Sequence, residues 1–184
     1  NYYLYINMED DDNNKYKYCK DINGKRIRVS IDNPMDVWSW KECKTKQDYW
    51  FKINVYLKTN PNSGYQTYTA NINYNNYALS RVIYKCFNND WDITDVSMIN
   101  YVDHINNNSL DNRIVNLRIL THQQNCFNRK NARGAYFRKD SNCWTAEIKI
   151  NGKKISKSGF ETEELAHQWY LMKKKELHII PDNL

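Results

Sequence analysis

Alternating apolar and polar residues predict β-strands in the first part of the chain. Residues 15–20 and 25–31 alternate on either side of Asp21-Ile22-Asn23-Gly24, which indicates a hairpin. A further alternating stretch, residues 51–57, is followed by an Asn- and Pro-rich break. Residues 1–62 are therefore predicted to be mostly β. The alternation indicates burial and does not indicate a function.

In the middle of the chain, the apolar residues change from every second position to helical spacing. Residues 65–72 alternate as a strand. The next stretch, residues 77–87, carries its apolar residues at helical intervals and has Ser80 near its start. These apolar positions are Leu79, Val82, Ile83 and Phe87. A strand followed by an amphipathic helix is predicted here.

The pair Asp103-His104 follows a short apolar strand predicted over residues 98–102. The Asn-rich run 106–108 suits a tight turn, because Asn tolerates a positive φ angle better than most residues. Apolar residues at 114, 117, 119 and 120 predict a returning strand, and Thr121 is a good N-cap for a helix after it. The order strand, turn, strand, helix would place His104 beside the first turns of that helix.

The C-terminal part predicts three strands and one helix. The strands are expected over residues 134–139, 144–150 and 153–157, and Asn151-Gly152 is the strongest hairpin signal in the chain. Thr162 begins a helix whose apolar residues recur near helical spacing. A three-stranded antiparallel sheet packed on one helix is predicted for this part.

Charge and cysteine content narrow the function classes. The formal net charge is +6, and residues 133–160 hold seven Lys and Arg against two Asp and Glu. This concentration of positive charge favours a nucleic-acid partner. The five cysteines are odd in number and lack a C-x-x-C pair, which argues against a disulfide framework or zinc cluster. With no apolar run long enough for a membrane span and no signal peptide, we expect an intracellular protein without a membrane partner.

The central stretch resembles the HNH family of nucleases, which carry the ββα-metal (His-Me finger) motif of phage and intron-encoded homing endonucleases. The matching residues are Asp103, His104, Ile105, Asn108, Asn112, Arg113, Asn116, Leu117, Arg118, Leu120, Thr121 and Asn125. The helix over residues 80–87 is similar to one that precedes the motif in this group, with Ser80 where His is usual. Asn107 stands where relatives often have Gly.

The resemblance implies a metal-dependent site. His104 would be the general base, because an imidazole can take up a proton near neutral pH. Asp103 and Asn125 would hold one divalent cation, Mg²⁺ or Mn²⁺, with Asn128 as the alternative to Asn125. Asn116 would keep the turn and His104 oriented. Three arginines are candidate phosphate contacts: Arg113, Arg118 and Arg129.

The C-terminal part is similar to the apetala-two/ethylene-response DNA-binding domain. The matching residues are Gly134, Ala135, Tyr136, Trp144, Ala146, Ile148, Asn151, Gly152, Lys153, Gly159, Phe160, Thr162, Glu164 and Ala166. Such domains lay their sheet in the major groove of DNA. The resemblance implies DNA contacts by Arg133, Arg138, Trp144, Lys149 and Lys153. A basic sheet that is only solvated is the alternative.

We therefore expect an α+β, modular protein with a ββα-metal nuclease core followed by a three-stranded antiparallel sheet packed on one helix. The predicted domains are a β-rich region (1–62), an HNH nuclease domain (63–131, with its motif at about 99–130) and a DNA-binding domain (132–184). The expected function is site-specific cleavage of double-stranded DNA of the homing type, with nicking by a monomer or cutting of both strands by a homodimer. The competing hypothesis is a non-catalytic DNA-binding regulator, and a nuclease that is RNA-directed or non-specific is a more distant one.

Overall fold

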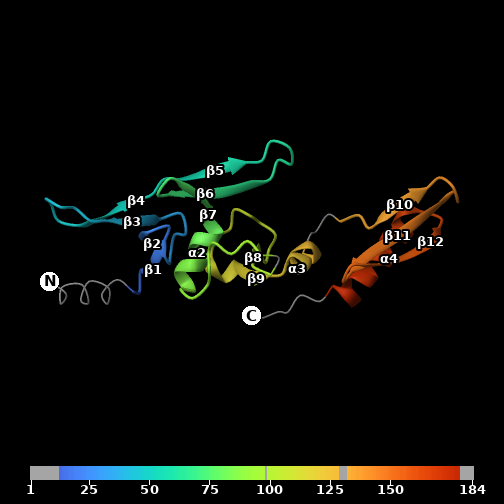
Figure 1. The fold of residues 1–184 in the computed structure, drawn as a ribbon. Coiled ribbons are helices and arrows are strands. Elements are labelled where there is room, and N and C mark those ends of the chain that lie inside the picture. The colour runs from blue at the N-terminus through green and yellow to red at the C-terminus, as the bar shows by residue number, and fades with distance from the viewer. Residues whose placement is uncertain (1–12, 98, 129–131, 179–184) are drawn as a thin grey trace. The chain divides into compact units, whose positions relative to one another are not determined.

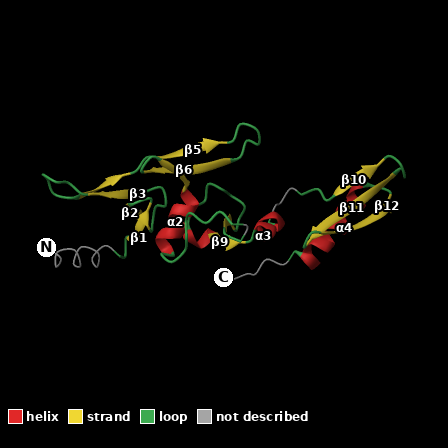
Figure 2. Cartoon of the chain, in the orientation of Figure 1, coloured by secondary structure: helices red, strands yellow, loops and turns green. Residues whose placement is uncertain are grey.

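A computed structural model of the chain describes residues 13–97, 99–128 and 132–178 (Figure 1). Strands and loops dominate the described residues, with few helices among them, as Figure 2 shows. The residues pack as two compact units. The first unit lies within Asn1–Val96 and His104–Arg118, and the second lies within Ser97–Asp103 and Ile119–Leu184. Several small antiparallel sheets with few helices fit the expected α+β class.

The first sheet of the first unit is an antiparallel meander of four strands. It consists of β1 (Tyr16–Ile22), β2 (Lys25–Ser30), β3 (Val37–Lys41) and β4 (Tyr49–Lys52). The turn between β1 and β2 has positive φ angles at Asn23 and Gly24, so the predicted hairpin is confirmed. Alternate side chains are buried, among them Cys19, Ile27 and Val29.

The predicted single strand over residues 51–57 is wrong, because the chain changes sheets within it. β4 ends at Lys52 and pairs with β3, whereas β5 (Val55–Thr59) pairs with β6 (Gln66–Ile72). At the change, Ile53 is buried and its backbone N–H donates to the carbonyl of Val37 at 2.8 Å. β6 then pairs with β7 (Asn75–Ala78), which completes a three-stranded sheet.

The helix α2 (Leu79–Phe87) confirms the helix predicted from apolar spacing. Leu79, Val82 and Ile83 are fully buried, and Ser80 is buried with them. The helix contacts β1, β2, β6 and β7, so its apolar side is the shared core of the two sheets. Burying a side chain of this size contributes about 1.5–3 kcal/mol.

The strand β8 (Tyr101–His104) starts later than the predicted strand over residues 98–102 and includes the Asp-His pair; position 98 lies outside the described residues. A turn with positive φ at Asn107 leads to the one-turn 3₁₀ helix η1 (Ile114–Asn116) and to β9 (Leu117–Leu120), which pairs with β8. The short helix α3 (His122–Phe127) follows. Thr121 caps it through a complete capping box with Gln124, as the sequence predicted for the N-cap.

The second unit contains the C-terminal sheet and helix. The strands β10 (Ala135–Arg138), β11 (Cys143–Ile150) and β12 (Lys153–Phe160) form an antiparallel sheet, and α4 (Glu163–Leu177) contacts all three. The core consists of Ala146, Ile148, Ala166 and Tyr170. Asn151 and Gly152 both have positive φ angles, so the second predicted hairpin is confirmed. No helix among the described residues is long and apolar enough to cross a membrane.

Candidate active site

Asp103 and His104 are the last two residues of β8, and both are buried, at 7% and 9% exposure. Adjacent side chains on a strand point to opposite faces. His104 contacts Asn112 and Asp103 contacts Asn128, so each side chain has its own partners.

The imidazole of His104 contacts a side-chain amide that follows it by eight residues. Its Nε2 lies 3.2 Å from Oδ1 of Asn112, whose side chain is only 2% exposed. The backbone around His104 is also held, because its carbonyl accepts from the N–H of Asn107 at 2.8 Å. The next residue, Ile105, donates its N–H to the carbonyl of Asn116 at 2.9 Å. Ring and backbone are therefore both positioned by the turn that follows β8.

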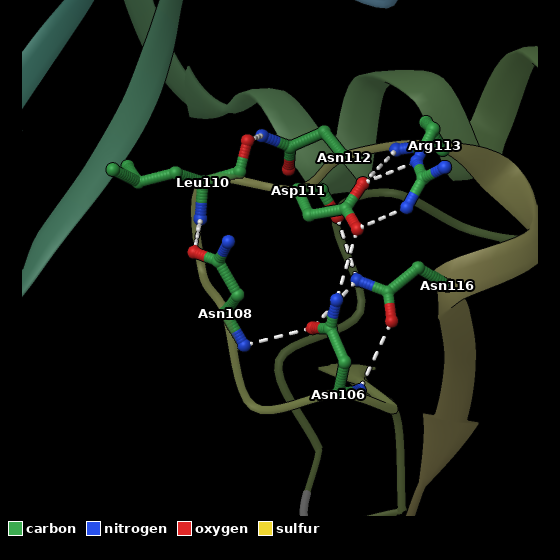
Figure 3. A network of polar contacts seen from close by, with 7 residues as sticks. All are labelled: Asn106, Asn108, Leu110, Asp111, Asn112, Arg113 and Asn116. Carbon is green, nitrogen blue, oxygen red and sulfur yellow. Dashed lines mark hydrogen bonds and ion pairs between the residues drawn. The ribbon is translucent and has the colours of Figure 1, made fainter.

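Asn116 is buried and ties the two ends of that turn together. Its Oδ1 accepts from the N–H of Asn106 at 3.0 Å, and its Nδ2 donates to Oδ1 of Asn106 at 3.0 Å. The same Nδ2 donates to the carbonyl of Asp111 at 2.7 Å. Figure 3 shows these side chains turned toward one another. Asn116 thus contacts the turn, and its role in orienting His104 stays a prediction, whereas the side chain of Asn112 contacts the imidazole.

Sequence reasoning did not single out Asn112 as a site residue. The signal was present, because Asn112 is one of the matching positions of the HNH pattern. It was missed because an Asn in an Asn-rich turn is most simply explained as a turn former. Only its burial and its contact with His104 separate it from its neighbours.

Asp111 and Arg113 form a two-point ion pair on the outside of the turn. Arg113 donates from Nε to Oδ1 of Asp111 at 2.8 Å and from Nη2 to Oδ2 at 2.7 Å. The hydrogen bonds from Arg113, with a further one from Asn106, lower the pKa of Asp111 to about 2. Asp111 in turn raises the pKa of Arg113. Arg113, expected as a phosphate contact, is thus engaged within its own turn in this structure.

We expect Asp111 to stay ionised down to about pH 2. The folded-state pKa lies below the ordinary value of 3.8, so its contribution to stability is present above that value and is lost as the pH falls toward 2. Carboxyl ¹³C shifts followed by NMR between pH 5 and 1.5 measure this directly. Replacing Arg113 with Gln should return the midpoint toward 3.8, and a wild-type midpoint near 3.8 would contradict the ion pair.

Asp103 is held by the residue that ends α3. Nδ2 of Asn128 donates to both carboxylate oxygens of Asp103, at 3.1 and 2.9 Å. Asn128 is the C-cap of α3 and is half-buried. Asn125 lies one turn earlier, and its backbone N–H donates to Thr121 as part of the helix. The sequence favoured Asn125 as the ligand, with Asn128 as the alternative, and Asn128 is the residue whose side chain contacts the carboxylate.

The donors around Asp103 fit a hard divalent cation. A carboxylate and side-chain amide oxygens are the ligands such a cation prefers, with water completing its shell. Asn128 presents its nitrogen to Asp103 here, and a half-turn of that amide would present its oxygen instead. The described residues hold no group of three or more His, Cys, Asp or Glu side chains that could bind a metal. Carboxylate and amide oxygens are hard donors, which suit Mg²⁺ or Mn²⁺.

The expected DNA-contact residues of the C-terminal sheet fall on both of its faces. Trp144 packs against the buried cluster on the helix side, with its ring centroid 5.5 Å from that of Phe137. Lys149 and Lys153 are exposed, and Arg138 pairs with Asp140. Arg133 is exposed, and its carbonyl accepts from Nδ1 of His167 at 2.6 Å.

The remaining expected phosphate contacts lie outside that sheet. Arg118 is half-buried on β9. Arg129 lies outside the described residues. Contact of these arginines with DNA stays a prediction.

Residues 77–126 match the family model described as HNH endonuclease. This segment is similar to HNH endonucleases. It contains α2, β8, β9 and most of α3, and thus both members of the Asp-His pair. We call it the HNH segment below. The match ends at Cys126, so the likeness of the C-terminal sheet to apetala-two domains stays a prediction.

One similar protein carries the same description. The chain is 39% identical over 80 residues to an uncharacterized HNH endonuclease of Acanthamoeba polyphaga mimivirus. The shared part covers 42% of this chain and 42% of that protein, so the chain spans less than half of its relative. No solved structure matched the chain.

Proposed function

We propose that this protein is a metal-dependent, site-specific DNA endonuclease of the homing type, with His104 as its general base. The observation that carries the proposal is the buried Asp103-His104 pair at the end of β8, inside the HNH segment, with an amide side chain held against each member. Elements β8, β9 and α3 would be its ββα-metal motif.

The reaction is hydrolysis of a phosphodiester bond. His104 takes a proton from water, and the water oxygen forms a bond to phosphorus. The bond from phosphorus to the 3′ oxygen breaks, and that oxygen keeps the electron pair and gains a proton from solvent. Asn116 maintains the turn that carries His104, through its contacts with Asn106 and Asp111.

Asp103 would hold the cation together with an amide oxygen from α3. A bound Mg²⁺ or Mn²⁺ would supply charge neutralisation at the scissile phosphate and the leaving oxygen. The contact of Asn128 with Asp103 favours Asn128 as the second ligand of the cation. The spacing of the HNH pattern favours Asn125. Both amides project from one short helix, so a variant at each position separates the two assignments.

The C-terminal sheet would select the DNA site for this cutter. Exposed Lys149 and Lys153 and the excess of positive charge in residues 133–160 favour contact with phosphates, which makes binding strongly dependent on salt. One such nuclease site cuts one strand. A monomer would therefore nick DNA, and a homodimer would cut both strands.

The competing proposal is a DNA-binding regulator that keeps the HNH scaffold without catalysis. The presence of both Asp103 and His104 favours the enzyme, because burying this polar pair is costly and a non-catalytic scaffold does not need it. A regulator would bind DNA equally well with and without a divalent cation and would leave it uncut.

Cleavage of a supercoiled plasmid library with random inserts tests the metal assignment. With Mg²⁺ or Mn²⁺ the wild type should nick or linearise plasmids, and EDTA should stop it. Asp103→Ala should lower the rate by roughly 10²-fold or more at any metal concentration.

Variants of α3 identify the second ligand. Asn125→Ala and Asn128→Ala are compared. Replacing the residue that binds the cation should raise the metal concentration needed for half-maximal cleavage, and replacing the other residue should not. Asn62→Ala, at an exposed asparagine between β5 and β6, serves as the control. Wild-type cleavage by Asp103→Ala would contradict the metal site.

A further inference from the structure

The sheet β1–β4 carries aromatic and cationic side chains on one of its two faces (Figure 1). Adjacent residues on a strand point to opposite faces. Cys19 is buried on the face toward α2, and Lys17, on the same face, has its Nζ 6.0 Å from the ring centre of Phe87 in α2. The alternate residues therefore point away from α2. Six of them form what we call the aromatic face: Tyr16, Arg26, Arg28, Trp38, Trp40 and Trp50.

Arg28 lies at the centre of the aromatic face, among three rings. Its guanidinium carbon is 4.3 Å from the ring centre of Tyr16, 5.1 Å from that of Trp38 and 4.7 Å from that of Trp50. All four side chains are half-buried. The rings and the cation hold one another in place, because a guanidinium is attracted to the faces of aromatic rings.

The sheet is also strongly basic. Residues 13–52 hold ten Lys and Arg against five Asp and Glu, the same excess as in residues 133–160. Within the four strands there are seven Lys and Arg and one Asp, because the other acidic residues lie in turns and loops. On the aromatic face, the guanidinium carbon of Arg26 lies 5.5 Å from the ring centre of Trp40, and Lys52 pairs with Asp36. This excess of positive charge attracts anions.

An anion that itself carries flat rings fits this combination of side chains best. In single-stranded nucleic acid the phosphates meet cations, and the faces of the bases stack on aromatic side chains. In duplex DNA the base faces are covered by neighbouring bases, and only the base edges are open in the grooves. A duplex would therefore use the cations of the aromatic face but not its rings.

We propose that the aromatic face of β1–β4 binds single-stranded DNA or RNA, with bases stacked on its rings and phosphates paired with its cations. This binding goes beyond the proposed nuclease function and does not depend on it, because the HNH segment begins at residue 77, after all the residues of the aromatic face. It gives a function to the β-rich first part of the chain.

Binding of the full chain to a labelled oligothymidylate of about 16 nucleotides, measured by fluorescence anisotropy in EDTA, tests the proposal without cleavage. We expect saturable binding that quenches tryptophan fluorescence and that an unlabelled duplex of equal length displaces poorly. An abasic oligomer of the same length keeps the phosphates and removes the bases. It should bind at least about fivefold more weakly, because a stacked base contributes that much or more. An oligouridylate of equal length identifies whether RNA or DNA is preferred.

Two neighbouring residues of β4 locate the binding. Trp50 belongs to the aromatic face, and Phe51 points to the opposite face of the sheet. Trp50→Leu should weaken binding of the oligothymidylate by about fivefold or more and leave duplex binding unchanged. Phe51→Leu, the matched control, should bind like the wild type.

A pair of charge variants tests the phosphate contacts. Arg26→Gln should lower the slope of the logarithm of affinity against the logarithm of salt concentration by about 0.7 for the oligothymidylate. Lys41, on the other face of β3, has its Nζ 5.9 Å from the ring centre of Tyr49. Lys41→Gln should leave the slope unchanged.

Two results would overturn the proposal. One is equal affinity of the wild type for the oligothymidylate and the abasic oligomer, which would mean that bases do not stack on the protein. The other is a folded Trp50→Leu protein that binds the oligothymidylate as tightly as Phe51→Leu does. Should Trp50→Leu fail to fold, the comparison of the two oligomers on the wild type still decides. Either failure leaves the nuclease function standing, and a protein that binds the oligothymidylate but cuts no DNA with any metal would contradict only the nuclease function.

Discussion

His104→Ala is expected to lower the rate of DNA cleavage about 10²- to 10⁴-fold while leaving DNA binding intact, because a positioned general base contributes that much to a proton-transfer step. His104 is buried at the end of β8. It is not part of the β10–β11–β12 sheet, which we expect to bind DNA. Single-turnover nicking of the plasmid library measures the rate, and a gel-shift assay in EDTA measures binding.

A matched control for this variant is His167→Asn. His167 lies on α4, and the amide NH₂ of Asn stands close to the position of Nδ1, which donates to the carbonyl of Arg133. It should cut at close to the wild-type rate. A His104→Ala protein that keeps its thermal stability and still cuts within a few-fold of wild type would refute the assignment of the general base.

Gly134→Ala is expected to destabilise the C-terminal sheet and helix by roughly 2–5 kcal/mol, from backbone strain and overpacking together. Gly134 has a φ of +61°, and a Cβ there would lie 2.1 Å from the ring of Tyr170. Tyr170 is part of the buried core of this unit, so its ring has little room to withdraw. Urea unfolding followed by tryptophan fluorescence, with Trp144 and Trp169 in this unit, reports the loss.

Gly152→Ala separates strain from crowding. Its φ of +77° is similar, but no atom lies within 4 Å of the added carbon. This variant should lose only about 1 kcal/mol, the lower end of the cost of a strained backbone. Equal losses at the two glycines would show that the Tyr170 contact contributes nothing.

Local sequence signals predicted the local parts of the fold. The Asn-Gly turns at 23–24 and 151–152 and the cap at Thr121 depend on residues within a few positions of one another. Helix α2 followed from the spacing of its apolar residues. The HNH pattern likewise located Asp103 and His104, which the structure buries together.

Features that depend on distant partners were not predicted. Alternation runs unbroken through residues 51–57, yet β4 and β5 belong to different sheets, because the pairing partners β3 and β6 lie elsewhere in the chain. Side-chain alternation carries no information on which strand will be the neighbour. The domain boundaries proposed at residues 62 and 131 remain a prediction, and the compact units are divided differently.

The sequence by itself determined that an Asp-His pair ends a strand and that an Asn-rich turn, a returning strand and a capped helix follow it. The sequence could not decide which of its many asparagines contact Asp103 and His104, because they carry the same amide group and lie close together in the chain. The tertiary structure decided this by burial and reach. Asn112 is enclosed against the His104 ring, Asn128 is brought to the Asp103 carboxylate, and Asn116 closes the turn that follows His104. Their roles differ because each amide meets a different partner.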